Sequence, residues 1–407
     1  MNVIVVGGGA AGLMAAGAAG RLGHTVTVVE RNPRPARKVM ITGKGRCNVT
    51  NNCSIDTFIG HVPENGRFLY SALNAFTPQD TMDLIESMGV PLKTERGNRV
   101  FPVSDKAVDV VDALVKYAKE GGARFIEGRV TQLVIEDGVC CGVKLEDGRV
   151  LEAYKVIVAT GGCSYPGTGS TGDGYTLARQ AGHTVVEPRP SLVALNSPDL
   201  FCQDMQGLSL KNCALQVRDN EKNKVIYSDL GEMLFTHFGV SGPMVLSASA
   251  HMRQMSPGRY TLYIDWKPGL TPEQLDARIL RDFAERSNMD LANALGKLLP
   301  RLLIPVMLDL CEIKPVKKCH AVTREERLRL VQGIKSMPVA VSGFRPLSEA
   351  IVTAGGVSVK EINAKTMESK LVSGLAFAGE VLDVDAYTGG FNLQIAFSTG
   401  MAAGNAE

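Results

Sequence analysis

The chain has 407 residues, of which 45% are hydrophobic and 21% are charged, and its net charge is +2. This length exceeds what one hydrophobic core usually organises, so two or three domains are expected. The composition is that of an ordinary globular protein, and its near neutrality excludes strong electrostatic attraction of the whole molecule to nucleic acid or membranes.

The cysteines indicate a reducing compartment. There are nine of them, an odd number, and no CxxC motif occurs, which argues against a disulfide reductase of the common flavoprotein type. No leader segment precedes the first apolar run, and no apolar stretch approaches the roughly 18 residues of a membrane span. We therefore expect a cytoplasmic protein with reduced thiols, no membrane contact and no metal site.

The first 30 residues predict a dinucleotide-binding fold. The β-branched run "NVIVV" (residues 2–6) is typical of a buried parallel strand, and Gly7, Gly9 and Gly12 follow it in GxGxxG spacing. A small-residue helix and a second strand ending at Glu30 come next. The glycines suit a tight turn, close approach of a pyrophosphate and close helix–strand packing, while the carboxylate suits ribose hydroxyls. The motif does not distinguish an FAD site from an NAD site.

Two segments rich in donors or glycine follow. "MITGKGRCNVTNN" (residues 40–52) has no helical or strand period and combines basic, Asn, Thr and Gly residues, as a ligand-binding loop would. "VIVATGG" (156–162) predicts a third buried strand that ends in glycines. A glycine-rich but irregular segment, 167–174, is no second GxGxxG motif.

The middle of the chain predicts an inserted domain over residues 191–342. Short strands with turn punctuation indicate a small β-barrel over about 191–268, and apolar residues at three- and four-residue spacing indicate helices over about 271–337. We interpret these apolar stripes as core. The insert contains His237, which is either a packed structural histidine or a proton donor near a substrate. A basic cluster near its end, "KPVKKCHAVTREERLR", is interpreted as a solvated helical face.

The C-terminal segment returns to the first domain. An apolar strand (Gly374 to Ala378) leads into Gly379 and Glu380, an acidic loop, a Gly-Gly turn and a small-residue helix. Such a strand-to-helix join offers free backbone N–H groups to a ligand. Strand ends this far apart in sequence predict one discontinuous α/β domain of residues 1–190 and 343–407.

Four segments together resemble a known family: "GGGAAGL", "RKVMITGKGRCNVTN", "ATGGCSYPGTGSTGDGY" and "GEVLDVDAYTGGFNLQIAFSTG". They are similar to the BaiN/RdsA family of flavoproteins, which includes a bile-acid reductase and a ribosomal-RNA dihydrouridine synthase, and "LFTHFGVSGP" strengthens the match. The resemblance implies a Rossmann-like domain that binds FAD non-covalently. It sets neither the substrate nor the number of subunits.

The resemblance also implies which residues lie along the cofactor. Pyrophosphate is expected at the glycine loop, ribose at Glu30, and phosphate and ring edge at the segment from Lys38 to Asn48, where this chain departs from the family pattern at Thr42 and Lys44. The full expected set is Gly7, Gly9, Ala10, Ala11, Gly12, Glu30, Arg31, Lys38, Thr42, Gly45, Arg46, Cys47, Asn48, Val130, Thr160, Gly161, Gly379, Glu380, Asp383, Asn392 and Leu393.

The expected chemistry is reduction of a C=C bond conjugated to a carbonyl, by hydride from N5 of reduced FAD, with NAD(P)H as electron donor. His237 and Cys163 are the candidate proton donors, although a small buried thiol is the more ordinary role for Cys163. The leading substrate is a uridine in ribosomal RNA, and the alternative is a bile acid or another small enone. A flavin amine oxidase and an FAD-binding interaction module without turnover stay open.

Overall fold

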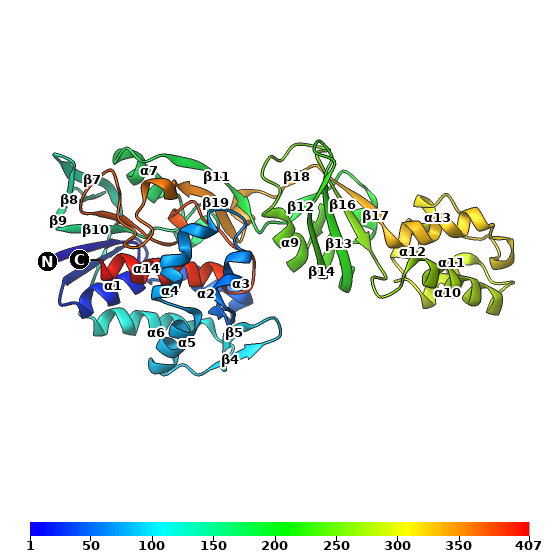
Figure 1. Ribbon diagram of the computed structural model, residues 1–407, viewed down its shortest axis with the longest axis horizontal. Helices are drawn as coiled ribbons and strands as arrows, with labels where there is room; N and C mark the ends of the chain where they lie inside the picture. Colours follow the sequence, from blue (N-terminus) through cyan, green and yellow to red (C-terminus); the bar gives the residue numbers. More distant parts are fainter. Residues whose placement is uncertain (407) are drawn as a thin grey trace. The chain divides into compact units, whose positions relative to one another are not determined.

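The computed structural model describes residues 1–406, and the chain divides into two compact units. Unit 1 combines Met1–Ser191 with Pro346–Glu407, and unit 2 is the intervening segment Leu192–Arg345. In Figure 1 the blue and cyan N-terminal elements and the red C-terminal helix accordingly belong to the same unit.

The centre of unit 1 is a five-stranded sheet in the order β20–β10–β1–β2–β6, and all of its pairings are parallel. Its strands are β1 (Asn2–Val6), β2 (Thr25–Glu30), β6 (Arg124–Glu127), β10 (Lys155–Val158) and β20 (Leu375–Phe377). β10 and β20 are buried along their whole length, as their continuous apolar sequences predict. Because carboxyl ends of parallel strands share one edge, the loops after β1, β10 and β20 lie together.

Small residues let the helices of unit 1 approach closely. Helix α1 (Ala10–Arg21) packs against α14 (Phe391–Asn405) and α6 (Ala107–Glu120), and Figure 1 shows α1 beside α14. A Cβ added to Gly400 would lie 2.3 Å from the Ala11 carbonyl oxygen, and one added to Gly404 would lie 2.4 Å from that of Ala15. The helix sequences are rich in Gly and Ala because backbone meets backbone at this crossing.

Smaller sheets and helices complete unit 1. The antiparallel sheets are β7–β8–β9 (Val130–Glu136, Val139–Leu145, Val150–Glu152), β3–β5–β4 (Thr50–Asn51, Arg99–Pro102, Leu92–Glu95) and β11–β19 (Val185–Ser191, Val352–Val357). The remaining helices are α2 (Arg37–Ile41), α3 (Ile55–Gly60), α4 (Tyr70–Ala75), α5 (Pro78–Ser87) and α7 (Asp173–Gln180), and short 3-10 turns include η8 (Gly379–Val381).

Unit 2 begins with a seven-stranded antiparallel sheet in the order β17–β16–β13–β14–β15–β12–β18. Its strands are β12 (Leu195–Asn196), β13 (Ser209–Asp219), β14 (Lys224–Thr236), β15 (Gly239–Ser241), β16 (Tyr260–Asp265), β17 (Met337–Val341) and β18 (Gly343–Phe344). The two strands at the ends of this order, β17 and β18, follow each other in the chain. The sheet therefore curls towards closure, in the manner of a small barrel.

Two short helices accompany this sheet, α8 (Phe201–Asp204) and α9 (Pro243–Ser249), and four more form the helical part: α10 (Pro272–Glu285), α11 (Leu291–Ala294), α12 (Leu303–Leu310) and α13 (Arg324–Lys335). The predicted start at Thr271 is confirmed, since its hydroxyl accepts the Gln274 N–H in a capping box. The apolar run 291–310 is interrupted between α11 and α12, around Pro300, which has no N–H to donate. Within residues 1–406, every helix falls short of the length or apolarity that a bilayer crossing requires.

Candidate functional site

The loop between β1 and α1 has the geometry of a pyrophosphate site. Gly7 has φ +100, and a Cβ added to it would lie 2.6 Å from the Ala159 carbonyl oxygen. A Cβ on Gly12 would lie 1.9 Å from the Gly7 carbonyl oxygen, whereas one on Gly9 would find only the Ala159 oxygen, at 4.0 Å. Gly7 and Gly12 are thus required by the protein's own packing, and the open side of Gly9 leaves room for a ligand at the N-terminus of α1.

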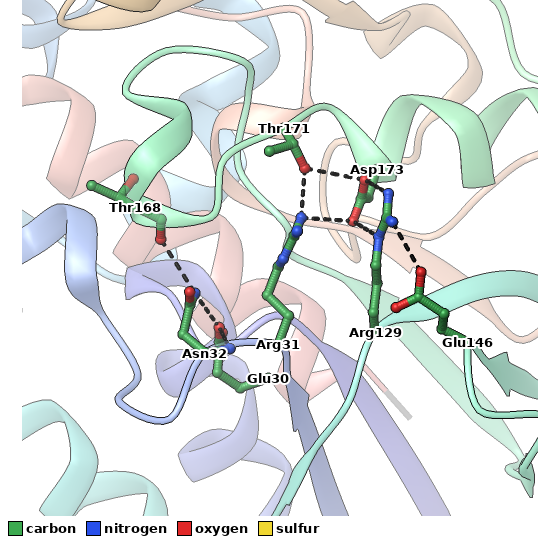
Figure 2. Close-up of polar contacts among 8 residues, drawn as sticks. All are labelled: Glu30, Arg31, Asn32, Arg129, Glu146, Thr168, Thr171 and Asp173. Atoms are coloured by element: carbon green, nitrogen blue, oxygen red, sulfur yellow. Dashed lines mark hydrogen bonds and ion pairs between the residues drawn. The ribbon is translucent and has the colours of Figure 1, made fainter.

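Glu30 stands at the carboxyl end of β2, and Figure 2 shows its side chain beside that of Asn32. Its Oε2 accepts the Gly8 N–H at 2.7 Å, and its Oε1 accepts the backbone and side-chain N–H groups of Asn32 at 2.8 and 2.7 Å. The Gly128 N–H donates to the Glu30 carbonyl oxygen, and this brings the start of β7 at Val130 near the same strand end. The carboxylate is fixed where a ribose is expected, with its orientation set before any ligand arrives.

Arg31 is held beside Glu30 by the glycine-rich segment after β10. Its guanidinium donates to the Thr171 hydroxyl at 2.6 Å and to Asp173 at 3.1 Å, while Arg129 makes two hydrogen bonds to the same carboxylate at 2.9 and 3.0 Å (Figure 2). Burial opposes ionisation of Asp173, but the hydrogen bonds and charges of Arg129 and Arg31 hold its pKa below the ordinary value. Segment 167–174 is therefore tied to the end of β2 that carries Glu30.

Lys38 ties together three separate chain segments. Its ammonium donates to the Ser164 hydroxyl at 2.7 Å and to both oxygens of Glu380 at 2.7 and 2.9 Å. Glu380 also accepts the Thr353 N–H at 2.8 Å, and the Thr353 hydroxyl accepts the Cys163 N–H at 2.8 Å. The three donors of the ammonium thus already have acceptors within the protein, so in this structure Lys38 organises the strand ends of β10 and β20.

The segment from Thr42 to Asn48 has mixed surroundings. Arg46 donates to Glu95 and Asp105 and lies 4.1 Å from the centre of the Phe101 ring. Burial raises the pKa of Cys47 to about 12, so this thiol stays protonated. The Thr42 hydroxyl donates to the Val39 carbonyl, and a Cβ on Gly45 would meet nothing within 4 Å. Contact of these residues with the cofactor stays a prediction, and Arg46 would have to share its guanidinium with two carboxylates.

Thr50 and Asn51, which the sequence reasoning missed, hold the start of α14. The Thr50 hydroxyl donates to the Gln394 side-chain oxygen at 2.6 Å, and the Asn51 amide donates to the Gly389 carbonyl oxygen at 3.0 Å. Gly390 has φ +97, and a Cβ there would lie 2.3 Å from the Thr50 carbonyl oxygen. A buried Gln inside a small-residue helix was the available signal, because such a side chain needs hydrogen-bond partners.

The loop before α14 is fixed by its own side chains. Asn392 accepts the Ala386 N–H at 2.9 Å and donates to the carbonyl oxygens of Ala386 and Tyr387 at 2.7 and 3.2 Å. The side-chain amide of Asn392 is thus already hydrogen-bonded to the backbone of this loop. Any contact of Asn392 and the half-buried Leu393 with a ring edge would therefore come from the backbone N–H groups of the first helical turn. Gly379 packs against the first turn of α1, since a Cβ on it would lie 2.8 Å from that of Ala11.

Two aspartates lie on the same loop. Asp383 accepts the Asn65 amide at 3.1 Å, and burial together with the nearby Glu64 raises its pKa. Asp385 is buried and accepts the Ser191 hydroxyl at 2.5 Å, and burial raises its pKa to about 6. Asp385 is therefore close to half-protonated under mildly acidic conditions.

Buried polar atoms without partners support a ligand at the shared strand edge. Within residues 1–406, the Oδ1 of Asn48, the Oγ1 of Thr160 and the hydroxyl of Tyr175 are buried and have no hydrogen-bond partner. Thr160 lies on the loop after β10, beside Gly161 with φ +74. Orphaned buried polar atoms are rare in proteins. Together with the open side of Gly9 and the fixed carboxylate of Glu30, they make these residues a fit for a dinucleotide such as FAD.

The two candidate proton donors differ in their surroundings. Cys163 is half-buried in unit 1, and burial together with Glu380 raises the pKa of its thiol, which is therefore protonated near neutrality. His237 lies in unit 2 in the turn between β14 and β15, where it is exposed and its ring centre is 5.0 Å from that of Phe238. Its exposure speaks against the packed structural histidine considered above.

Most of the basic cluster "KPVKKCHAVTREERLR" is paired inside unit 2. Lys317 contacts Glu326 at 2.6 Å, Lys318 contacts Asp290 at 2.7 Å, and Arg327 contacts Asp276 at 2.6 Å. Arg329 donates to the Cys311 carbonyl oxygen. These contacts agree with the solvated helical face that the sequence indicated.

Comparison with known proteins gives a consistent assignment. Residues 1–406 match the family model of the HI0933-like protein Rossmann domain. The chain is 30% identical to the ribosomal RNA dihydrouridine synthase of Escherichia coli over 98% of this chain and 96% of the relative, and 31% identical to the 3-dehydro-bile acid delta(4,6)-reductase of Clostridium scindens over 100% and 99%. Among solved structures, the apo Sdh1 complex of Mycobacterium smegmatis has a TM-score of 0.50 at 19% identity and covers 99% of this chain and 67% of that chain.

Proposed function

The chain belongs to the HI0933-like family of FAD-dependent oxidoreductases, and from this premise we propose that it reduces the C5=C6 bond of a uridine in large-subunit ribosomal RNA. This bond is conjugated to a carbonyl, as is the C=C bond of a steroid enone, so the two named kinds of relative pose the same chemical problem. A ribosomal substrate would place the protein in the cytoplasm.

We assign the binding of the cofactor to the residues of unit 1. When bound and reduced, FAD supplies the hydride for such a reduction. The loop around Gly9 accommodates the pyrophosphate, Glu30 accepts hydrogen bonds from the adenosine ribose, and the N-terminus of α14 presents N–H groups to the other end. The bonds from Thr50 and Asn51 keep that helix start in place.

A proton must accompany the hydride, and we assign its delivery to His237. This side chain is exposed and lies in the tight turn that joins β14 to β15. An imidazole exchanges protons near neutral pH, whereas the raised pKa of Cys163 makes that thiol a reluctant donor. His237→Ala should therefore leave the flavin bound and slow turnover.

The observation that carries the choice of RNA over a small enone is the distribution of charge. Residues 192–345 contain 20 Lys and Arg against 16 Asp and Glu, a net charge of +4, while the whole chain has +2. The rest of the chain is consequently acidic, with a net charge of −2. A positively charged inserted unit favours a polyanionic substrate. A steroid or bile acid would require an apolar surface instead.

The test is the dihydrouridine content of large-subunit ribosomal RNA, measured by nucleoside mass spectrometry. A strain without this gene should lose the modification, the intact gene should restore it, and a Gly9→Val copy that cannot hold FAD should fail to restore it. Unchanged dihydrouridine after deletion would refute the RNA substrate and leave reduction of a small enone as the assignment.

A second measurement addresses the electron donor, which we propose to be NADH or NADPH. Purified flavoprotein is mixed anaerobically with each nucleotide, and bleaching of the flavin absorbance is followed. Bleaching by one nucleotide and reoxidation by uridine-containing ribosomal RNA would support the proposal. Rapid production of hydrogen peroxide from an amine, without either nucleotide, would show an oxidase instead.

A further inference from the structure

Unit 2 contains a cavity of about 610 Å³ that is separate from the cofactor residues. It lies where α8 of the sheet part meets α12 and the loop 312–315, and its lining includes Phe201, Val306 and Ile313. This volume is within the range of ligand sites in proteins. We call it the acidic pocket, because three carboxylates belong to its lining.

Three carboxylates line the acidic pocket, those of Asp204, Asp309 and Glu312. All three side chains are exposed, and none forms a hydrogen bond or ion pair with any of residues 1–406. Lys314 is the one basic residue of the lining, so the pocket carries an excess of negative charge. This sign is opposite to that of unit 2 as a whole, which has a net charge of +4.

Two of these carboxylates occupy positions where they oppose the stability of α12. Asp309 lies in the last turn of the helix and Glu312 directly after its C-cap, and no basic residue stands in that turn. A helix C-terminus carries partial negative charge and is stabilised by cations. Glu312 also has φ +56, in the left-handed region where glycine is favoured after a helix. Acidic residues at a helix C-terminus and a left-handed residue other than glycine are both locally unfavourable. Unfavourable features that nothing else in the chain offsets are typical of functional sites.

Exposed apolar side chains belong to this pocket or adjoin its lining in the sequence. Leu310 belongs to its lining and is 42% exposed, while Leu200, just before α8, and Val316, just after the loop, are 74% and 72% exposed. Exposed aliphatic residues near a concave acidic surface suit a ligand that combines positive charge with an apolar group. Nucleic acid and anionic lipid are unsuited to it, because their phosphates would face the carboxylates.

From these observations we propose that the acidic pocket binds a lysine- or arginine-rich segment of a partner protein, which inserts one aliphatic side chain between α8 and α12. The cations of the segment compensate Asp204, Asp309, Glu312 and the C-terminal end of α12. This assignment is independent of the redox substrate, since the pocket shares no residue with the cofactor site.

The test uses the full-length flavoprotein and a fluorescein-labelled peptide of sequence KRLKR, followed by fluorescence anisotropy. Replacing the Leu of the peptide by Ser should weaken binding at least fivefold, and a peptide with Glu at every basic position should not bind. Asp309→Lys should weaken binding of KRLKR at least tenfold. The matched control is Glu285→Lys, an exposed carboxylate at the end of α10 with the same charge change, and it should leave binding unaltered.

Glu312→Gly separates binding from a structural effect. Glycine relieves the strain of the left-handed backbone at position 312, and it removes a negative charge that the helix C-terminus repels. The variant should therefore melt at a higher temperature while it binds KRLKR several-fold more weakly. Equal weakening by Glu285→Lys, or equal binding of the basic and acidic peptides, would overturn the proposal. So would sedimentation showing that Asp309→Lys dissociates a dimer of the chain, because the pocket would then accept a second copy.

Discussion

The candidate sites of the two units are made of different kinds of residue. In unit 1 the site is made of backbone and small side chains: a Cβ on Gly12 would lie 1.9 Å from the Gly7 carbonyl oxygen, and Gly9 is open. In unit 2 the distinguishing features are charges, with 20 basic and 16 acidic residues and a local reversal of sign at the acidic pocket. Close backbone packing allows only glycine at particular positions. A charged surface requires only that the charges have a suitable net sign and lie in a suitable region.

The largest expected effect lies in the glycine loop and sharpens this contrast. Gly12→Val places side-chain atoms inside the space of the Gly7 carbonyl, so unit 1 should lose both its flavin and its cooperative melting transition. Gly9→Val meets only the Ala159 oxygen at 4.0 Å and should fold normally without the cofactor. Visible flavin absorbance and a thermal melt of each variant provide the measurement. Retained flavin in Gly9→Val would contradict the placement of the pyrophosphate.

The next effect concerns the ion pair of Lys38 and Glu380, whose side chains are 22% and 20% exposed. Lys38→Met leaves the carboxylate largely buried without its cation and should lower the free energy of unfolding by about 2 kcal/mol. A chemical denaturation curve measures this change. Arg34→Met is the control, because its partner Asp112 is 68% exposed and the loss should stay below about 0.5 kcal/mol. Adding Glu380→Gln to Lys38→Met should recover part of the loss.

The pH dependence of stability should report the buried Asp385. An aspartate titrates near 3.9 in the unfolded chain, and the pKa of Asp385 is raised to about 6 in the folded protein. The folded state therefore binds the proton of Asp385 more tightly than the unfolded state does. The stabilisation that this proton gives is lost as the pH rises from about 4 to about 6. Asp385→Asn removes this loss, so the variant should gain up to about 3 kcal/mol relative to the parent by pH 7. Denaturation at a series of pH values tests the sign: a gain at pH 4 instead would refute it.

The smallest effect is expected from the surface of unit 2. Lys297 and Arg301 are exposed and have no side-chain hydrogen bond or ion pair within residues 1–406. Reversing both charges with Lys297→Glu and Arg301→Glu should weaken binding of ribosomal RNA about threefold to tenfold and flatten its salt dependence. Filter binding at several salt concentrations measures both quantities. Lys119→Glu on α6 of unit 1 should change neither, and an equal effect there would mean that the charge of unit 2 is not specific.

Elements with strong local signals could be predicted closely. The strand at residues 2–6, the strand ending at Glu30 and the helix starting after Thr271 lie where apolar period and capping residues placed them. The run 291–310 was harder, since its apolar spacing is helical but Pro300 interrupts it. Likewise, the basic residues Lys38 and Arg46 suggested phosphate binding, yet each has carboxylate partners far away in the sequence.

The sequence by itself determined the dinucleotide fold and the family of the protein, because glycine spacing, buried strands and an acidic strand end are local patterns that few folds require together. Only the tertiary structure decided which side-chain donors are already hydrogen-bonded within the protein. Glu380 meets Lys38 across 342 residues, and Gln394 meets Thr50 across 344, so no local pattern reveals either contact. The same holds for the acidic pocket, where α8 and α12 converge from 100 residues apart. Pairing of side chains over such separations depends on the fold. Whether a charged residue is paired or available to a ligand can therefore be read only from its neighbours in the folded protein.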